Sequence, residues 1–156
     1  MNPWAKAVTD TFMEALGVAK CELRFFREEN EGLLDIIDGL TAEQASTRLP
    51  NCSSIVAHTR HTLAYIESDL DAIRGGQGLT DWEETWSIQE MDEAEWQALR
   101  ADLRNKSGEW IGLINANPNW EDSLWMRGAI GSAAHAAYHL GAIRQLSANL
   151  INYPLA

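Results

Sequence analysis

Apolar residues recur every three or four positions along most of this chain, the spacing that places them on one face of an α-helix. No segment combines a two-residue alternation of apolar and polar side chains with the β-branched enrichment of strands. The pattern therefore predicts an all-α protein.

The first long helix is predicted over the segment from Trp4 to Asp38. Asn2 and Pro3 resemble a helix cap followed by a first-turn proline, and apolar residues continue at helical spacing beyond them. A bend is expected near Gly17 or Gly32. The pattern is interpreted as one long helix with a bend.

Three more long helices follow, and each is bounded by cap or breaker residues. They are predicted to begin after Ser53, at the capping box Asp92–Glu95 and at about Trp125. Their predicted ends are Gly75-Gly76, the asparagine-rich segment 115–119, and Leu150, after which Asn152 and Pro154 close the last helix.

The connections carry two further signals. Thr41–Gln44 has the form of a capping box and predicts a short helical turn, which Pro50 ends. The segment from Gly75 to Glu90 is predicted to be a loop of about 15 residues, and loops of that length in compact domains are often functional. Trp82 and Trp86 lie in it.

Composition agrees with one folded domain that spans residues 1–156. The chain is 46% hydrophobic and 22% charged, which is enough apolar material to fill one core. Four long helices in a domain of this size predict a four-helix bundle. Trp96 and Trp110 fall on the apolar face of the third long helix and are expected in its core.

The net charge of -11 restricts the partners. Lysine and arginine gather into no patch, so we expect no binding to nucleic acid or to an anionic membrane surface. No apolar run approaches the roughly 20 residues that span a bilayer. The first 17 residues do not resemble a signal peptide, and the expected location is the cytoplasm. There, Cys21 and Cys52 are expected to be reduced and buried, with a reactive thiol as the alternative.

The four histidines are the most informative residues of the chain. His58 and His61 lie on the second long helix, and His135 and His139 lie on the last. Residues four apart share a helix face, so His135 and His139 can direct two imidazoles to one point. Both continue the apolar stripe of their helix and are expected to face inward. His58 also follows an apolar stripe, whereas His61 is rotated toward its edge, so His58 is the preferred third ligand.

Three neutral imidazoles with an open position are typical of a catalytic metal site. Zinc and nickel are the metals expected first, and iron or manganese are alternatives. The competing interpretation is that the histidines are core residues with hydrogen-bond partners in the protein. The segment from His135 to His139 lacks the glutamate of the HExxH signature, so zinc-protease chemistry is not predicted. Trp82, Trp86 and Trp125 are candidates for lining a pocket.

Three segments resemble the DinB-like superfamily, also called DinB/YfiT-like. They are Ser54–His61 (SIVAHTRH), Trp86–Trp96 (WSIQEMDEAEW) and His135–Arg144 (HAAYHLGAIR), and the likeness covers roughly residues 20 to 150. The resemblance implies a four-helix bundle of up-down-down-up topology, often a homodimer. Ala142 stands where many relatives carry glutamine.

The resemblance also implies a site and an activity. The metal ligands it implies are His58, His135 and His139, with His61 as an extra ligand or a residue that supports one. Characterised relatives include transferases that use low-molecular-weight thiols and some metal-dependent hydrolases. We therefore expect a small-molecule substrate, and a low-molecular-weight thiol in the first instance. A metal-binding or stress-related protein without turnover is the alternative, and a plain interaction bundle is a third.

Overall fold

The computed structural model describes residues 2–18, 25, 31–77, 80–117 and 119–152. Within these ranges the chain forms seven α-helices and no strand, so the all-α prediction is confirmed. None of these helices has the length and apolar character that crossing a bilayer requires. The helices are α1 (Pro3–Leu16), α2 (Leu33–Asp38), α3 (Ala42–Ser46), α4 (Ile55–Ile73), α5 (Trp82–Ser87), α6 (Glu93–Ala116) and α7 (Ser123–Asn152).

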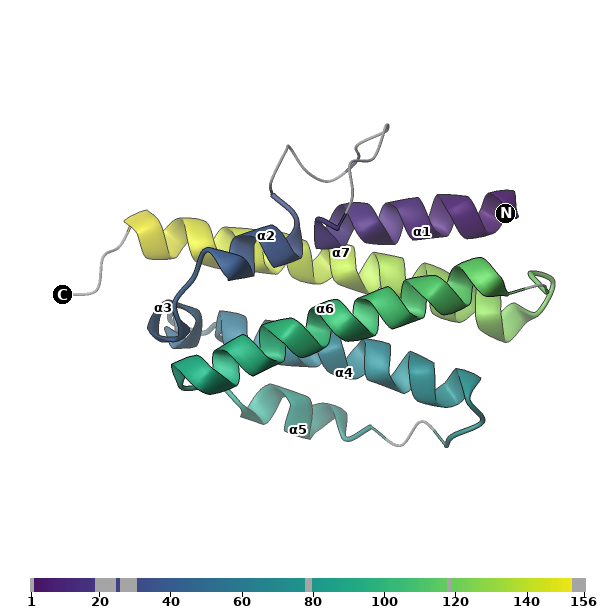
Figure 1. Ribbon diagram of the computed structural model, residues 1–156. Coiled ribbons are helices and arrows are strands. Elements are labelled where there is room, and N and C mark those ends of the chain that lie inside the picture. Colours follow the sequence, from purple (N-terminus) through teal and green to yellow (C-terminus); the bar gives the residue numbers. More distant parts are fainter. Residues whose placement is uncertain (1, 19–24, 26–30, 78–79, 118, 153–156) are drawn as a thin grey trace.

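The four longest helices, α1, α4, α6 and α7, pack side by side (Figure 1). In that view α1 and α7 point one way, and α4 and α6 point the other. Helix α7 contacts both α1 and α4, while α5 packs on α4. The core between them contains fully buried large side chains, among them Phe12, Ile66, Trp96, Trp110 and Leu140. The predicted core positions of Trp96 and Trp110 are thus confirmed.

The predicted helix starts are confirmed where a capping residue marked them. The Asn2 side chain accepts a hydrogen bond from the Trp4 amide at 2.8 Å, next to the first-turn proline. Thr41 and Asp92 each begin a helix with a complete capping box. These contacts lie within a few residues of chain, so a local pattern is sufficient to predict them.

The prediction of one continuous helix over residues 4–38 is wrong. Helix α1 ends at Gly17, whose φ of 87° is left-handed, and Gly32 is an extended residue that precedes α2. The two glycines touch: a Cβ on Gly32 would lie 2.2 Å from the Cα of Gly17. This approach of two backbones requires glycine at position 32 and cannot occur inside one helix. Residues 19–24 and 26–30, which the predicted helix also included, lie outside the described residues.

The prediction of a loop over Gly75–Glu90 missed a short helix within that segment. Helix α4 ends as expected near Gly75, which has φ 82°. The segment then contains α5, which Asp81 caps by accepting hydrogen bonds from the Glu83 and Glu84 amides. A helix of only six residues carries little periodic signal, and its packing on α4 stabilises it.

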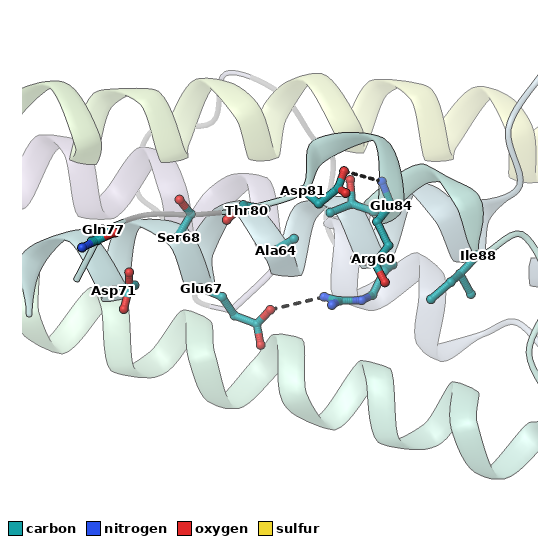
Figure 2. A pocket seen from close by; sticks show the side chains of 11 residues that line it. Arg60, Ala64, Glu67, Ser68, Asp71, Gln77, Thr80, Asp81, Glu84 and Ile88 are labelled. Carbon is teal, nitrogen blue, oxygen red and sulfur yellow. Dashed lines mark hydrogen bonds and ion pairs between the residues drawn. The ribbon is translucent and has the colours of Figure 1, made fainter.

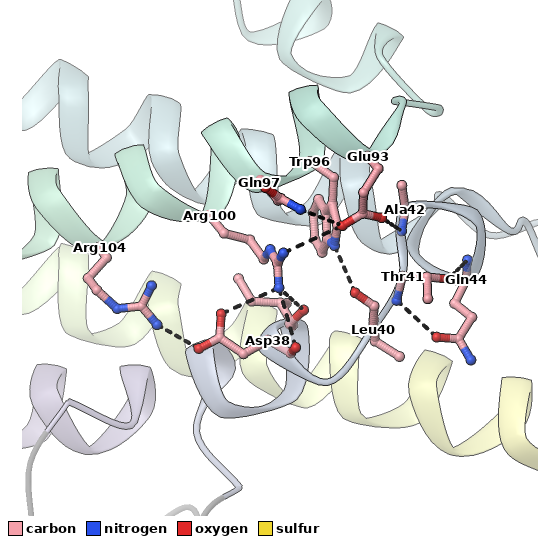
Figure 3. Close-up of polar contacts among 11 residues, drawn as sticks. Asp38, Leu40, Thr41, Ala42, Gln44, Glu93, Trp96, Gln97, Arg100 and Arg104 are labelled. Carbon is pink, nitrogen blue, oxygen red and sulfur yellow. Dashed lines mark hydrogen bonds and ion pairs between the residues drawn. The ribbon is translucent and has the colours of Figure 1, made fainter.

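Polar contacts tie the α2–α3 connection to α6 (Figure 3). Arg104 donates to the Asp38 carboxylate at 2.6 Å, and the Trp96 indole donates to the Leu40 carbonyl at 3.0 Å. The Glu93 carboxylate accepts from the Ala42 amide at 3.0 Å. The last two bonds satisfy backbone groups of Leu40 and Ala42, where α2 connects to α3.

The prediction of two reduced, buried cysteines can be compared with the structure only at Cys52. Cys52 is a free thiol and is half-buried. Cys21 lies outside the described residues.

Candidate metal centre

All four histidines meet between α4 and α7. His58 and His61 come from α4, His135 and His139 come from α7, and the two helices pack against each other. The Nε2 atoms of His135 and His139 lie 3.2 Å apart. His139 is 1% exposed, whereas the other three are half-buried. The cluster is therefore set in the core at His139 and approaches the surface at the other three.

One ring nitrogen from each of His61, His135 and His139 lies within 4.8 Å of the other two, so this triad could hold a metal ion. A tetrahedral zinc ion with nitrogens at about 2.0–2.1 Å places any two of them about 3.3 Å apart. The 3.2 Å separation of His135 and His139 is close to that value.

His58 contacts a different atom. Its Nδ1 lies 2.9 Å from Nδ1 of His139, on the opposite side of the His139 ring from the nitrogen that faces His135. The sequence favoured His58 as the third ligand and kept His61 as an extra one. The geometry instead groups His61 with the two histidines of α7, while the role of His58 as a ligand stays a prediction.

The His58 contact bears on which nitrogen of His139 can bind a metal. Two neutral imidazoles 2.9 Å apart share one proton, so one ring donates and the other accepts. If His139 donates through Nδ1, its Nε2 carries the lone pair that points toward His135. His58 then acts as the hydrogen-bond acceptor that orients a metal ligand.

Aromatic rings surround the cluster. The Trp86 ring stacks on His61 with centroids 4.3 Å apart, and its edge meets His58 at 5.1 Å. Tyr65 stacks on His135 with centroids 4.1 Å apart, and its ring lies 6.0 Å from that of Trp82. These contacts restrict the planes of two imidazoles and exclude water from part of their surface. Trp82, 5.6 Å from His61, extends the same aromatic wall.

Gly131 makes room for Tyr65. A Cβ at position 131 would lie 2.6 Å from the Tyr65 hydroxyl, so a larger residue there would require the end of the Tyr65 side chain to shift. Gly131 lies one turn along α7 from His135 and leaves space for the Tyr65 side chain that stacks on that histidine.

Burial holds the imidazoles neutral. It is the main cause that lowers the pKa of His139 to about 2, and the neighbouring imidazoles add to the effect. Burial, followed by the charge of His61, lowers the pKa of His135 to about 4. The pKa values of His58 and His61 are lowered by burial as well. Neutral imidazole is the form that binds a metal, so protons compete weakly for this site.

Without metal, the protein is expected to lose stability as the pH falls. The folded pKa values of His135 and His139 lie below the ordinary 6.5, so their contribution is complete above that pH and declines as the pH drops toward them. The contribution of Asp69 to stability depends on pH in the opposite direction. Burial raises the pKa of Asp69 to about 6, so its contribution is lost as the pH rises through that value. The net loss from about pH 7 to pH 5 should be about 2 kcal/mol after allowance for solvent exposure.

Urea unfolding at several pH values measures this loss. Asp69→Asn removes the opposing contribution, so the decline should be steeper in that variant. A free energy of unfolding that is constant or rises toward pH 5 would contradict neutral, buried histidines.

A cleft of about 580 Å³ lies beside the cluster, between α4 and the segment that contains α5 (Figure 2). Its walls include Glu67, Asp81 and Glu84, and the guanidinium of Arg60 pairs with Glu67 at 3.2 Å. Thr85 lines the cleft and also lies 2.7 Å from His61. The carboxylates make this cleft unfavourable for an anionic ligand.

Several residues of the site were not predicted. Tyr65 follows His61 by four positions, so helical spacing could have identified it. No comparable pattern in the sequence indicated Thr85, which contacts His61, or Tyr138. The Tyr138 ring meets the His139 ring edge-on, with centroids 5.0 Å apart. Of the tryptophans expected at a pocket, Trp82 and Trp86 lie at the cluster, whereas Trp125 stacks on Trp110.

Comparison of the chain with protein-family models, with curated proteins and with solved structures finds no match.

Proposed function

We propose that the protein binds one divalent metal ion through His61, His135 and His139. The observation that carries the proposal is the separation of their ring nitrogens, all within 4.8 Å of one another, on two helices that pack together. Burial keeps these rings neutral and therefore able to coordinate. Hydrogen bonds from His61 to Thr85 and from His139 to His58 would support two of these rings through their other nitrogens.

An all-imidazole set favours zinc or nickel over iron, and manganese prefers oxygen ligands. Three protein nitrogens leave a position open in a four-coordinate site. A bound metal of this kind lowers the pKa of a coordinated water or thiol, which supplies a nucleophile near neutral pH.

The activity we propose is transfer of a low-molecular-weight thiol to an electrophilic small molecule, with hydrolysis as the alternative reaction. The half-buried rings of His61 and His135 support access from solvent, and the aromatic wall of Trp82, Trp86 and Tyr65 supports a site with little water. The opposite directions of α1 and α7 against α4 and α6 support an up-down-down-up topology of the DinB/YfiT-like kind (Figure 1).

A homodimer and a cytoplasmic location remain part of the proposal. Ile130 and Tyr138 are exposed apolar side chains on α7, and they would suit contact with a second copy.

One observation favours a different role. Each imidazole already has a hydrogen-bond partner in the protein: His58 with His139, His139 with His135, and His61 with Thr85. Such a network can stabilise a core without metal. A metal-binding protein without turnover is the intermediate possibility.

Elemental analysis of protein purified without a histidine tag separates these functions. We expect about one equivalent of zinc or nickel per chain, with anomalous scattering from a point between α4 and α7. A core network predicts no stoichiometric metal. Thiol conjugation to an electrophile, assayed with the metal-loaded protein, then tests turnover.

His139→Ala provides the comparison for that assay. Activity should fall to background while the circular dichroism spectrum stays helical, because the variant loses a ligand on a helix that remains packed. Equal rates for parent and variant would exclude metal-dependent thiol transfer at this site.

A further inference from the structure

Helix α5 is attached to the helix that carries two of the histidines. The Ser54 amide donates to the Gln89 side-chain oxygen at 2.8 Å, and the Ser54 hydroxyl donates to the Gln89 carbonyl at 2.6 Å. The Gln89 amide group in turn donates to the Trp86 carbonyl at 2.7 Å. Since Ser54 is the N-cap of α4, the end of α5 is held one turn from His58 and two from His61.

Within α5, Thr85 makes two short contacts through one hydroxyl. Its Oγ1 lies 2.7 Å from the Trp82 carbonyl oxygen and 2.7 Å from Nδ1 of His61. A carbonyl oxygen can only accept, so the single hydroxyl proton goes to Trp82. The contact with His61 is a hydrogen bond only if His61 donates through Nδ1.

This direction fixes the tautomer of His61. A neutral imidazole with its proton on Nδ1 carries its lone pair on Nε2, and that is then the nitrogen available to a metal. Thr85 is 5% exposed, so water has little access to replace its hydroxyl. The stack of Trp86 on His61 sets the plane of the ring, and the Thr85 bond sets which nitrogen is free.

We propose that Thr85 is a positioning residue that prepares Nε2 of His61 for metal binding. The inference rests on the proposed metal site and extends it, because the site then depends on the packing of α5 against α4. Metal binding and the packing of α5 on α4 then reinforce each other, and loss of either weakens the other.

Thr85→Val tests the proposal, because valine keeps the branched shape and removes the hydroxyl. Its affinity for zinc should be about tenfold lower than that of the parent, the lower end of effects seen when a supporting hydrogen bond of a metal ligand is removed. Thr85→Ser restores the hydroxyl and should recover the parent affinity within about twofold.

Ser87→Ala is the matched control. The Ser87 hydroxyl donates to the Glu84 carbonyl three residues earlier at 2.7 Å, which is the same bond that Thr85 makes to Trp82. The control therefore loses an equivalent helix contact without touching a histidine, and its zinc affinity should equal that of the parent. If Thr85→Val and Ser87→Ala both bind zinc like the parent, the positioning role is excluded.

Long-range proton–nitrogen NMR correlation of the metal-free parent gives a readout independent of metal affinity. His61 should carry its proton on Nδ1, and the Nδ1 tautomer should lose population in Thr85→Val and return in Thr85→Ser. A parent His61 with its proton on Nε2 would overturn the inference even if the valine variant is poorly folded. If the parent binds no zinc but shows the Nδ1 tautomer, the metal proposal fails while the hydrogen-bond assignment stands.

Discussion

Alanine at His135 or at His61 is expected to weaken zinc binding about 100-fold, whereas alanine at His58 should weaken it about tenfold. Zinc sites with four protein ligands bind with apparent free energies of about 10–16 kcal/mol, so one ligand contributes about 3 kcal/mol. His61 and His135 each provide a nitrogen to the triad, while His58 reaches only the far nitrogen of His139. Its loss removes support from a ligand without removing a ligand.

Competition with a chromophoric chelator at fixed pH measures these affinities. Thermal unfolding of the metal-free variants serves as the control for folding. The decisive comparison is between His58 and His61, since both lie on α4 three positions apart. If the His58 variant lost binding and the His61 variant kept the parent affinity, the order of ligands expected from the sequence would hold and the triad geometry would be wrong.

Replacing Trp110 with alanine is expected to destabilise the protein by about 3–5 kcal/mol. The side chain is 0% exposed, and its ring stacks parallel to Trp125 with centroids 6.0 Å apart. Its indole N–H donates to the Ser132 hydroxyl at 2.9 Å, and Ser132 also contacts Asp69. Alanine would leave a cavity between α6 and α7 and remove a donor from a buried polar network.

Trp4→Ala is the control, because Trp4 is 66% exposed and its loss should change the free energy of unfolding by less than about 0.5 kcal/mol. Chemical denaturation of both metal-free variants measures the difference. A loss of under about 1 kcal/mol for Trp110 would mean that the core closes around the vacancy, which is not expected of helices held by many other buried side chains.

Helix boundaries were largely predictable where they depend on residues close together in the chain. The caps at Asn2, Thr41 and Asp92 form hydrogen bonds within three positions, and Gly75 ends α4 with a positive φ. The same locality explains one error. A bend was predicted near Gly17 or Gly32, but only the fold shows that the two glycines touch and that α1 ends at Gly17.

The pairing of His135 with His139 follows from the sequence alone, because a helix has 3.6 residues per turn and a spacing of four places both rings on one side. Their inward direction follows from the apolar stripe that they continue. The two histidines of α4 lie near this pair because α4 packs on α7. The predicted helical bundle made such packing possible but did not specify it.

The tertiary structure alone decided which histidine of α4 joins that pair. His58 and His61 lie less than one turn apart, and periodicity distinguishes them only by a rotation about the helix axis. Their roles depend on contacts with residues distant in the chain. Thr85 and Trp86 contact the His61 ring. Nδ1 of His58 forms a hydrogen bond with Nδ1 of His139. Such contacts form between segments far apart in the chain, so no local pattern of residues encodes them.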